Sequence, residues 1–446
     1  MPDKSWVIDK GKTDGATPGF RVKIPELGKF MLKADFGTQP ERPSAASAIG
    51  VRIYHAAGFH VACDSVVYFK PGLLKLNPGL KVTDNTGVTR PFDQAALEKV
   101  LKTTPRRGDE IRMQSSQWLS GVPLGPFTYD GVREDDPNDV IPHQDRRELR
   151  GARLLAAWIN HFDAREQNTM SVWMAADEKK PDTSPGYVKH YYLDMSDSLG
   201  SEWDWDGISR RLGHSYYLDF ADIGRDFLTL GLIERPWDRA RRQPGAENLG
   251  YFPNDDFEAE GWKAGYPNPA FSRMTEHDGA WMTRIIARFT PAMIAAIVKT
   301  GQFTNPYHER LVNHALLERR RLILHRYLGR LSPLTDFAVG EGGLCGVDLA
   351  RQSGVFPEKH FGYRAEVRPP GEGAARPVSV TAGAAGSVCL DLRPEAPDSG
   401  VVDDDPSRYR VVTVHNEQAP GALSLHLYDL GPRRGLRLVG LERPLP

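Results

Sequence analysis

Three stretches with different hydrophobic patterns follow one another along this chain of 446 residues, and their order constrains the fold more than any other feature. From Val7 to about Phe69, short apolar runs alternate with glycines, which is typical of strands and turns. From about Ile141 to Leu328, apolar residues recur at spacings of three and four, which predicts helices. After Pro333, short apolar runs between prolines and glycines indicate a small β-domain. The chain is therefore expected to have an α+β fold.

Several individual elements can be placed from the local pattern. Apolar periodicity and turn residues predict a hairpin from 20–24 and 29–34, a helix over 44–57, a strand over 66–69, a helix ending near 161, and a second hairpin from 170–174 and 187–193. Further helices are expected from Thr290 and over 311–328.

The charge balance limits the kinds of partner. Lys and Arg number 57 and Asp and Glu number 58, so the formal net charge is -1. A chain without a global basic field is not expected to bind nucleic acid or anionic membranes through overall charge. No apolar run approaches the roughly 20 residues that cross a bilayer, so no membrane span is expected.

The cysteines and the N-terminus bear on the compartment. Cys63, Cys345 and Cys389 lie far apart, which excludes a disulfide framework and a thiolate zinc cluster and allows one bridge at most. The N-terminal residues lack the pattern of a secretory signal. We expect a cytoplasmic protein, or an exported one whose leader has been removed.

The residues that suggest a chemistry follow the helix that ends near His161. Phosphoryl transfer needs a carboxylate at the acceptor hydroxyl, a basic group near the moving phosphate, and oxygen ligands for magnesium. Asp163 can act as the base or orienting group, and Arg165 can lie by the γ-phosphate. Asn168, five residues after Asp163, and Asp194, at the end of a predicted strand, can bind the metal.

This pattern, His-x-Asp-x-Arg-x-x-Asn followed by a strand that ends in Asp-Met-Ser, resembles the catalytic and metal-binding loops of the protein-kinase-like superfamily. The closer resemblance is to its atypical bacterial branches, the HipA-like and CotH-like kinases. The chain departs from the family pattern in having Phe162 for arginine, Arg165 for lysine, and Met195-Ser196 for Phe-Gly. The resemblance extends from about residue 7 to about residue 328.

The N-terminal third is similar to the nucleotide-binding part of such a kinase. Gly11, Gly15 and Gly19 precede a strand and can place backbone amides over phosphates. Lys33, at the end of the next strand, resembles the lysine that contacts the α and β phosphates. The resemblance also implies an acidic partner for Lys33, and Glu41 is the acid nearest the predicted helix.

The resemblance implies a two-lobed protein-kinase-like fold, to which the strand pattern adds a small C-terminal β-sandwich. We expect a kinase-like N-lobe over residues 1–75, a mainly helical C-lobe over 76–335 and a β-rich domain over 350–446. The implied activity is an ATP- and Mg²⁺-dependent transfer of phosphate to a hydroxyl. The acceptor can be a protein, a peptide or a small molecule, and nucleotidyl transfer is a variant of the same chemistry. The C-terminal domain can bind a protein or a carbohydrate.

Other interpretations of the same residues stay open at this point. Asp163 and Asn168 are also typical of helix ends, and the three glycines of ordinary hairpin turns. A protein that binds nucleotide without turnover, a pseudokinase scaffold, would keep the same order of motifs. His161 and Asp163 with a distant His190 or His214 match the composition of a two-His, one-carboxylate iron oxygenase.

Overall fold

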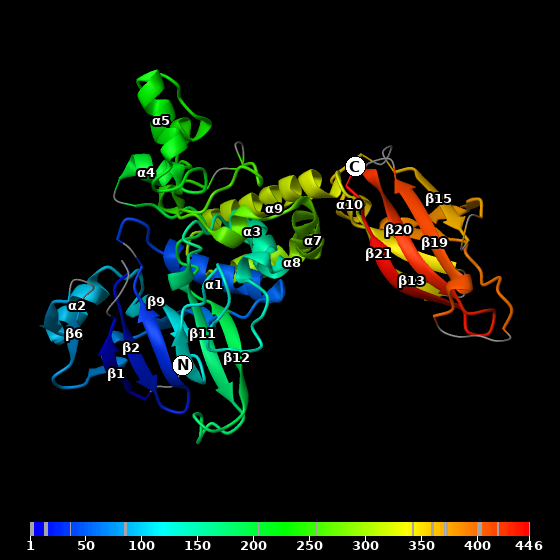
Figure 1. The fold of residues 1–446 in the computed structure, drawn as a ribbon. Helices are drawn as coiled ribbons and strands as arrows, with labels where there is room; N and C mark the ends of the chain where they lie inside the picture. Colours follow the sequence, from blue (N-terminus) through cyan, green and yellow to red (C-terminus); the bar gives the residue numbers. More distant parts are fainter. Residues whose placement is uncertain are drawn as a thin grey trace. The chain divides into compact units, whose positions relative to one another are not determined.

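The computed structural model describes residues 4–445 except 13–16, 36, 84–86, 204, 253, 255, 256, 341, 342, 358–360, 370, 372, 399–403, 417 and 418. These residues form a mixed α+β structure with several sheets, as expected (Figure 1). The chain divides into two compact units, one of residues 1–274 and 289–319 and the other of residues 275–288 and 320–446.

A seven-stranded sheet forms the N-terminal part of the first unit. Its strands are β1 (Trp6–Gly11), β2 (Gly19–Ile24), β3 (Gly28–Lys33), β4 (Asp64–Phe69), β5 (Leu74–Leu76), β8 (Arg106–Arg107) and β9 (Glu110–Gln117). The order is β4-β9-β3-β2-β1-β5, with β8 paired to β9, and only the β1–β5 pair is parallel. The predicted hairpin is confirmed as β2 and β3, and the predicted strand as β4.

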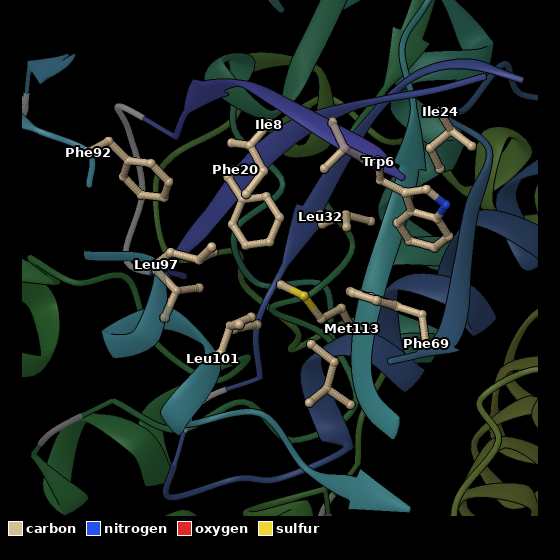
Figure 2. Close-up of a cluster of buried hydrophobic side chains, with 14 residues drawn as sticks. Trp6, Ile8, Phe20, Ile24, Leu32, Phe69, Phe92, Leu97, Leu101 and Met113 are labelled. Carbon is tan, nitrogen blue, oxygen red and sulfur yellow. The ribbon is translucent and has the colours of Figure 1, made fainter. Parts of the chain in front are cut away.

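One face of this sheet carries a hydrophobic core (Figure 2). Alternate residues of β1 and β2, such as Trp6, Ile8 and Phe20, are fully buried there because successive side chains of a strand point to opposite faces. Helix α2 (Gln94–Lys102) adds Leu97 and Leu101 to the same cluster. The end of β3 is thereby held in a rigid sheet.

Helix α1 (Arg42–Ala56) packs against β4 and β9. Pro43 stands in its first turn, where a missing backbone N–H costs nothing, and most of its residues are small and buried. The helix predicted over 44–57 is therefore confirmed with a shift of two residues at its start.

The rest of the first unit is mainly helical and contains a three-stranded sheet of order β10-β11-β12. Its strands are β10 (Val122–Gly125), β11 (Thr169–Ala175) and β12 (Gly186–Tyr192), and a separate pair is formed by β6 (Lys81–Thr83) and β7 (Thr89–Pro91). The helices are α3 (Arg147–Ile159), α4 (Asp206–Arg211), α5 (Phe220–Thr229), α6 (Pro269–Ser272), α8 (Pro291–Lys299) and the first part of α9 (Pro306–Leu328). The second predicted hairpin is confirmed as β11 and β12.

The second unit contains α7 (Glu276–Ala287), the end of α9 and two antiparallel sheets. One sheet has β13 (Leu334–Gly340), β14 (Gly343–Asp348), β17 (Val380–Ala382) and β18 (Ser387–Leu390). The other sheet has β15 (Tyr363–Arg368), β16 (Arg376–Val378), β19 (Tyr409–Asn416), β20 (Ala419–Asp429) and β21 (Leu436–Glu442). The short helix α10 (Leu349–Ser353) follows β14. Buried residues of both sheets belong to one hydrophobic cluster. Cys345 on β14 and Cys389 on β18 face each other and form a disulfide.

Two boundaries differ from the predicted ones. The N-terminal sheet extends beyond residue 75, because β9 lies between β3 and β4 and completes their hydrogen bonding. The second unit also takes in residues 275–288 from the predicted C-lobe. In the described part of the chain no single helix is long and apolar enough to cross a membrane, and only α7 and α8 taken together reach that length and composition.

Candidate active site

Lys33 and Asp194 form an ion pair between parts of the chain that are 161 positions apart. Lys33 is the last residue of β3, and Asp194 comes two residues after β12. The distance from Lys33 Nζ to Asp194 Oδ2 is 2.7 Å, and the two side chains are 11% and 29% exposed. Asp194 has a φ of 38°, a left-handed conformation that is uncommon outside glycine and often marks a functional turn.

The pair is strongly coupled through charge. Burial acts to lower the pKa of Lys33, but the charge and hydrogen bond of Asp194, together with the charges of Asp64 and Asp197, outweigh it and the pKa is raised. Burial alone would raise the pKa of Asp194, yet the charge and hydrogen bond of Lys33, together with a hydrogen bond from Ser196 Oγ, hold it well below its usual range. Both groups are therefore ionised at neutral pH.

The loop after α3 carries the other predicted residues. The helix ends because Asn160 takes a left-handed conformation with φ 53°, and its side-chain amide donates to the carbonyl oxygen of Leu212 while its Oδ1 accepts from Trp262 Nε1. The backbone N–H of Gly265 donates to the carbonyl oxygen of Phe162. These contacts fix the course of the loop on both sides of His161.

Within this loop Asp163 and Asn168 are joined directly. Asn168 Nδ2 donates to the backbone oxygen of Asp163 at 2.8 Å and to its Oδ2 at 2.9 Å. Arg165 Nε lies 3.1 Å from Asp163 Oδ1. The backbone oxygen of Asn168 accepts from the N–H of Leu193, which places the loop beside the residue that precedes Asp194. The four predicted residues Asp163, Arg165, Asn168 and Asp194 are thus brought into one region.

Asp163 has an unusual protonation behaviour. Burial raises the pKa of this carboxyl to about 6, and the negative charge of Asp197 adds to the effect, while Arg165 and Asn168 oppose it. A carboxylate with a pKa near neutrality can accept a proton from a hydroxyl more readily than one with an ordinary value. Asp163 is therefore suited to act as a general base.

Asp197 is a residue of this region that was not predicted from the sequence. Its pKa is raised by burial and then by the charge of Asp194, and Ser201 Oγ donates to its Oδ1. The only signal for it in the sequence is its position three residues after Asp194. The charge of Asp194 thus raises the pKa of both Asp163 and Asp197, and the charge of Asp197 raises that of Asp163.

The acid predicted to pair with Lys33 is used elsewhere. Glu41 accepts two hydrogen bonds from Thr304, from Oγ1 at 2.8 Å and from the backbone N–H at 3.0 Å. Its left-handed backbone (φ 69°) just before α1 positions the carboxylate for these bonds. The expected Lys33–Glu41 pair is not formed, and Asp194 takes its place.

A second buried carboxylate acts on Lys33. Asp64 begins β4, and its charge helps to raise the pKa of Lys33. Asp64 Oδ2 accepts from Ser47 Oγ of α1 at 2.5 Å and from Gln114 Nε2 of β9 at 2.9 Å. No motif in the sequence marks Asp64, because its role depends on the pairing of strands that are distant in the chain.

The glycines have a structural role where the structure describes them. A Cβ at Gly11 would lie 2.1 Å from Val82 Cγ2, and one at Gly19 would lie 2.4 Å from the backbone oxygen of Leu32. Gly15 lies outside the described residues. Lys12 directly follows β1, and its charge helps to lower the pKa of Asp194.

The chemistry of the donors suits a small hard cation. Asn168 and Asp194 supply oxygen ligands only, which magnesium prefers, and magnesium sites of kinases use one or two carboxylates together with phosphate oxygens. The mutual repulsion of the three carboxylates would be relieved by a cation. In the described part of the chain, no three His, Cys, Asp or Glu side chains converge as a complete protein-only metal site. The residues fit Mg²⁺ bound together with phosphate oxygens.

The histidines do not form the alternative iron site. Burial lowers the pKa of His161 to about 4, and its ring packs edge-on against Tyr54. His190 Nδ1 lies 3.0 Å from Ser171 Oγ, and His214 stacks on Trp237. These described side chains do not converge on one point with Asp163.

The structure is similar to the crystal structure of a proinflammatory kinase from Helicobacter pylori, CtkA. The TM-score is 0.37 at 11% sequence identity, and the match covers 73% of this chain and 96% of the other. A TM-score this low does not establish a shared fold. No family model and no curated protein sequence matches the chain.

Proposed function

We propose that the protein is an ATP- and Mg²⁺-dependent phosphotransferase that acts on a hydroxyl group. The observation that carries the proposal is the buried Lys33–Asp194 ion pair next to the hydrogen-bonded pair of Asp163 and Asn168. These are the residue types that hold a triphosphate, a metal ion and an acceptor in phosphoryl transfer. The first unit would then have a two-lobed protein-kinase-like fold, and the two sheets of the second unit would form a small β-sandwich.

The proposed mechanism assigns each side chain one task. Lys33 holds the α and β phosphates, since its pKa keeps it charged. Asn168 and Asp194 would hold Mg²⁺, which neutralises charge on the phosphates when bound. Asp163 orients the acceptor and takes the proton of its hydroxyl as the oxygen–phosphorus bond forms and the bond to ADP breaks. Arg165, ion-paired to Asp163 and 40% exposed, stabilises the charge of the moving phosphoryl group.

Mass spectrometry of the purified protein with ATP and Mg²⁺ tests the reaction class. A gain of one phosphate on the protein or on an added acceptor, or steady release of ADP, supports the proposal, and a gain of AMP would indicate nucleotidyl transfer instead. Asp163→Asn should lower turnover by about 100-fold or more while ATP binding is kept. Asp194→Asn should remove the Mg²⁺-dependent part of ATP binding.

A matched control is Asp109→Asn, which removes an exposed aspartate that pairs with Lys70 on the surface. This variant should behave as the wild type. If Asp163→Asn and Asp194→Asn transfer phosphate at the wild-type rate, the assignment is wrong. If ATP binds with Mg²⁺ but no product forms in any condition, the protein is a nucleotide-binding scaffold.

A further inference from the structure

The segment 218–233, which contains α5, exposes an unusual amount of apolar surface. Eight of its large apolar side chains are between 47% and 85% exposed: Leu218, Phe220, Ile223, Phe227, Leu228, Leu230, Leu232 and Ile233. Phe220, Ile223 and Phe227 recur at spacings of three and four along the helix, and with Leu230 at its C-cap they make up the apolar stripe. No other part of the described chain has such a density of exposed large apolar residues.

Asp222 of α5 faces the protein, whereas the side chain of Asp226 is 45% exposed and Arg225 is exposed. Asp222 is 6% exposed, and its carboxylate accepts from Ser215 Oγ at 2.7 Å. Arg235 pairs with Asp226 at 2.7 Å and donates to the backbone oxygen of Asp222. A surface helix normally turns its apolar stripe towards the core and its charges towards water. In α5 the apolar stripe is exposed, and Asp222 is the one buried residue among the ten of the helix.

The helix is also fixed in this orientation. Asp219 caps its first turn by accepting from the N–H of Asp222, and Lys263 Nζ donates to Asp219 Oδ2 at 2.7 Å. Together with Arg235, these bonds attach both ends of the polar side to the first unit. The outward position of the apolar stripe is therefore set by specific contacts of the polar side.

The size of this surface matches a dimer interface. At roughly 150 Å² for each fully exposed large apolar side chain, the eight side chains present on the order of 800 Å². The largest apolar patch of a typical monomer is about 300–600 Å², whereas a stable interface buries about 800 Å² on each partner. The four stripe residues supply about half of this area and the flanking Leu218, Leu228, Leu232 and Ile233 the other half, so a stable dimer needs the whole segment in the contact.

The charges around the stripe favour a second copy over a lipid surface. Helices that lie on anionic membranes carry lysine and arginine on their polar side. The polar residues of α5 include one basic side chain, Arg225, against Asp222 and Asp226, and Arg235 pairs with both aspartates. The stripe itself carries no charge, so an identical stripe meets it without repulsion. A two-fold interface requires such a self-complementary surface.

We propose that segment 218–233 is the interface of a homodimer, in which the apolar stripe of α5 packs against the same stripe of a second copy. This inference does not depend on the proposed enzymatic activity. Because the contact is isologous, residues in the middle of the stripe lie near the two-fold axis and meet their own counterparts.

Sedimentation equilibrium of the full chain, from about 1 to about 100 μM, tests the dimer directly. The wild type should sediment as a dimer, and Phe227→Glu should weaken association by at least about 100-fold, because each copy buries one charge in place of a phenyl ring. Phe227 is 79% exposed in the single chain, so the change should leave the fold of each copy intact, which the far-UV circular dichroism spectrum measures. Val140→Glu, at a position 75% exposed outside the segment, is the matched control and should remain a dimer.

Cross-linking gives a second measurement that does not depend on affinity. In a Cys63→Ser background, which removes the exposed free cysteine, Ile223→Cys should form a disulfide-linked dimer on mild oxidation, whereas Val140→Cys should not. A wild type that is monomeric throughout the concentration range overturns the proposal. So does a Phe227→Glu variant that dimerises like the wild type. Co-flotation of the wild type, but not of Phe227→Glu, with phosphatidylglycerol vesicles would assign the stripe to a membrane instead.

Discussion

Replacing Lys33 by methionine would show how much the proposed active site depends on its central ion pair. Lys33→Met keeps the length of the side chain and removes its charge, which leaves Asp194 without its cation in a largely buried position. Breaking one partner of a buried pair costs about 3–5 kcal/mol. Because the Asp194 side chain is 29% exposed, water screens part of the loss, and we expect about 2–3 kcal/mol.

A double-mutant cycle separates the pair from other effects of the substitution. Lys33→Met and Asp194→Asn should each destabilise the protein, and the double variant should lose less than the sum, with a coupling of about 2 kcal/mol. Lys70 and Asp109 form a surface pair of the same residue types at 2.9 Å, with side chains 66% and 71% exposed. The same cycle at this pair should show no measurable coupling.

Urea unfolding followed by tryptophan fluorescence reads mainly the unit that contains the pair. Of the nine tryptophans, only Trp281 lies in the second unit. The fluorescence change therefore follows the unfolding of the first unit in the full chain. Only this unit, and not both units together, then has to be treated as a two-state transition.

The pH dependence of the coupling provides a further check. The pKa of Asp194 is lowered in the folded state, so its contribution is present above the unfolded value of about 4 and is lost as the pH falls towards the folded value. The pKa of Lys33 is raised, so its contribution is present below about pH 10 and is lost as the pH rises through the folded value. A coupling near zero at pH 7, or one equal to that of Lys70 and Asp109, would refute the reasoning.

Three other perturbations have defined outcomes. Asp163→Asn should stabilise the protein by up to about 2 kcal/mol at pH 8 but not below about pH 4, as urea unfolding at both pH values measures. Burial and then Asp197 raise the pKa of Asp163 to about 6, so the cost of ionising it in the folded state grows from about pH 4 and is complete above about pH 6. Glu41→Ala should cost about 1–3 kcal/mol, because it removes two hydrogen bonds to Thr304, whereas Glu41→Gln should retain one; thermal unfolding compares them. The double variant Cys345→Ala with Cys389→Ala should destabilise the second unit by roughly 2–4 kcal/mol in calorimetry, without moving the tryptophan transition of the first.

Local features of this protein are predictable from its sequence. The hairpins of β2–β3 and β11–β12 and the helix α3 follow from apolar spacing and turn residues, because these patterns depend on neighbours a few positions away. The order of the candidate site residues along the chain can also be read from the sequence, because it needs no knowledge of distant contacts. The phosphotransferase assignment remains a prediction from that order.

The pairings across the fold are decided only by the tertiary structure. Lys33 pairs with Asp194 and not with Glu41, and Asp64 and Asp197 lie in the same region. These contacts form because strands β3, β4 and β9 and the turn after β12 come together in the folded chain. Sequence separation carries no information on which of several carboxylates will lie within reach of one cation.

Helix α5 shows the same division between the two kinds of information. Its sequence has an ordinary amphipathic pattern, from which the apolar side would be placed against the core. In the structure the apolar side is exposed, because the aspartates of this segment pair with basic residues of neighbouring segments. Asp219 pairs with Lys263, and Asp222 and Asp226 pair with Arg235. Periodicity determines that a helix has two faces, whereas the charges that surround it in the folded chain determine which face is left for a partner.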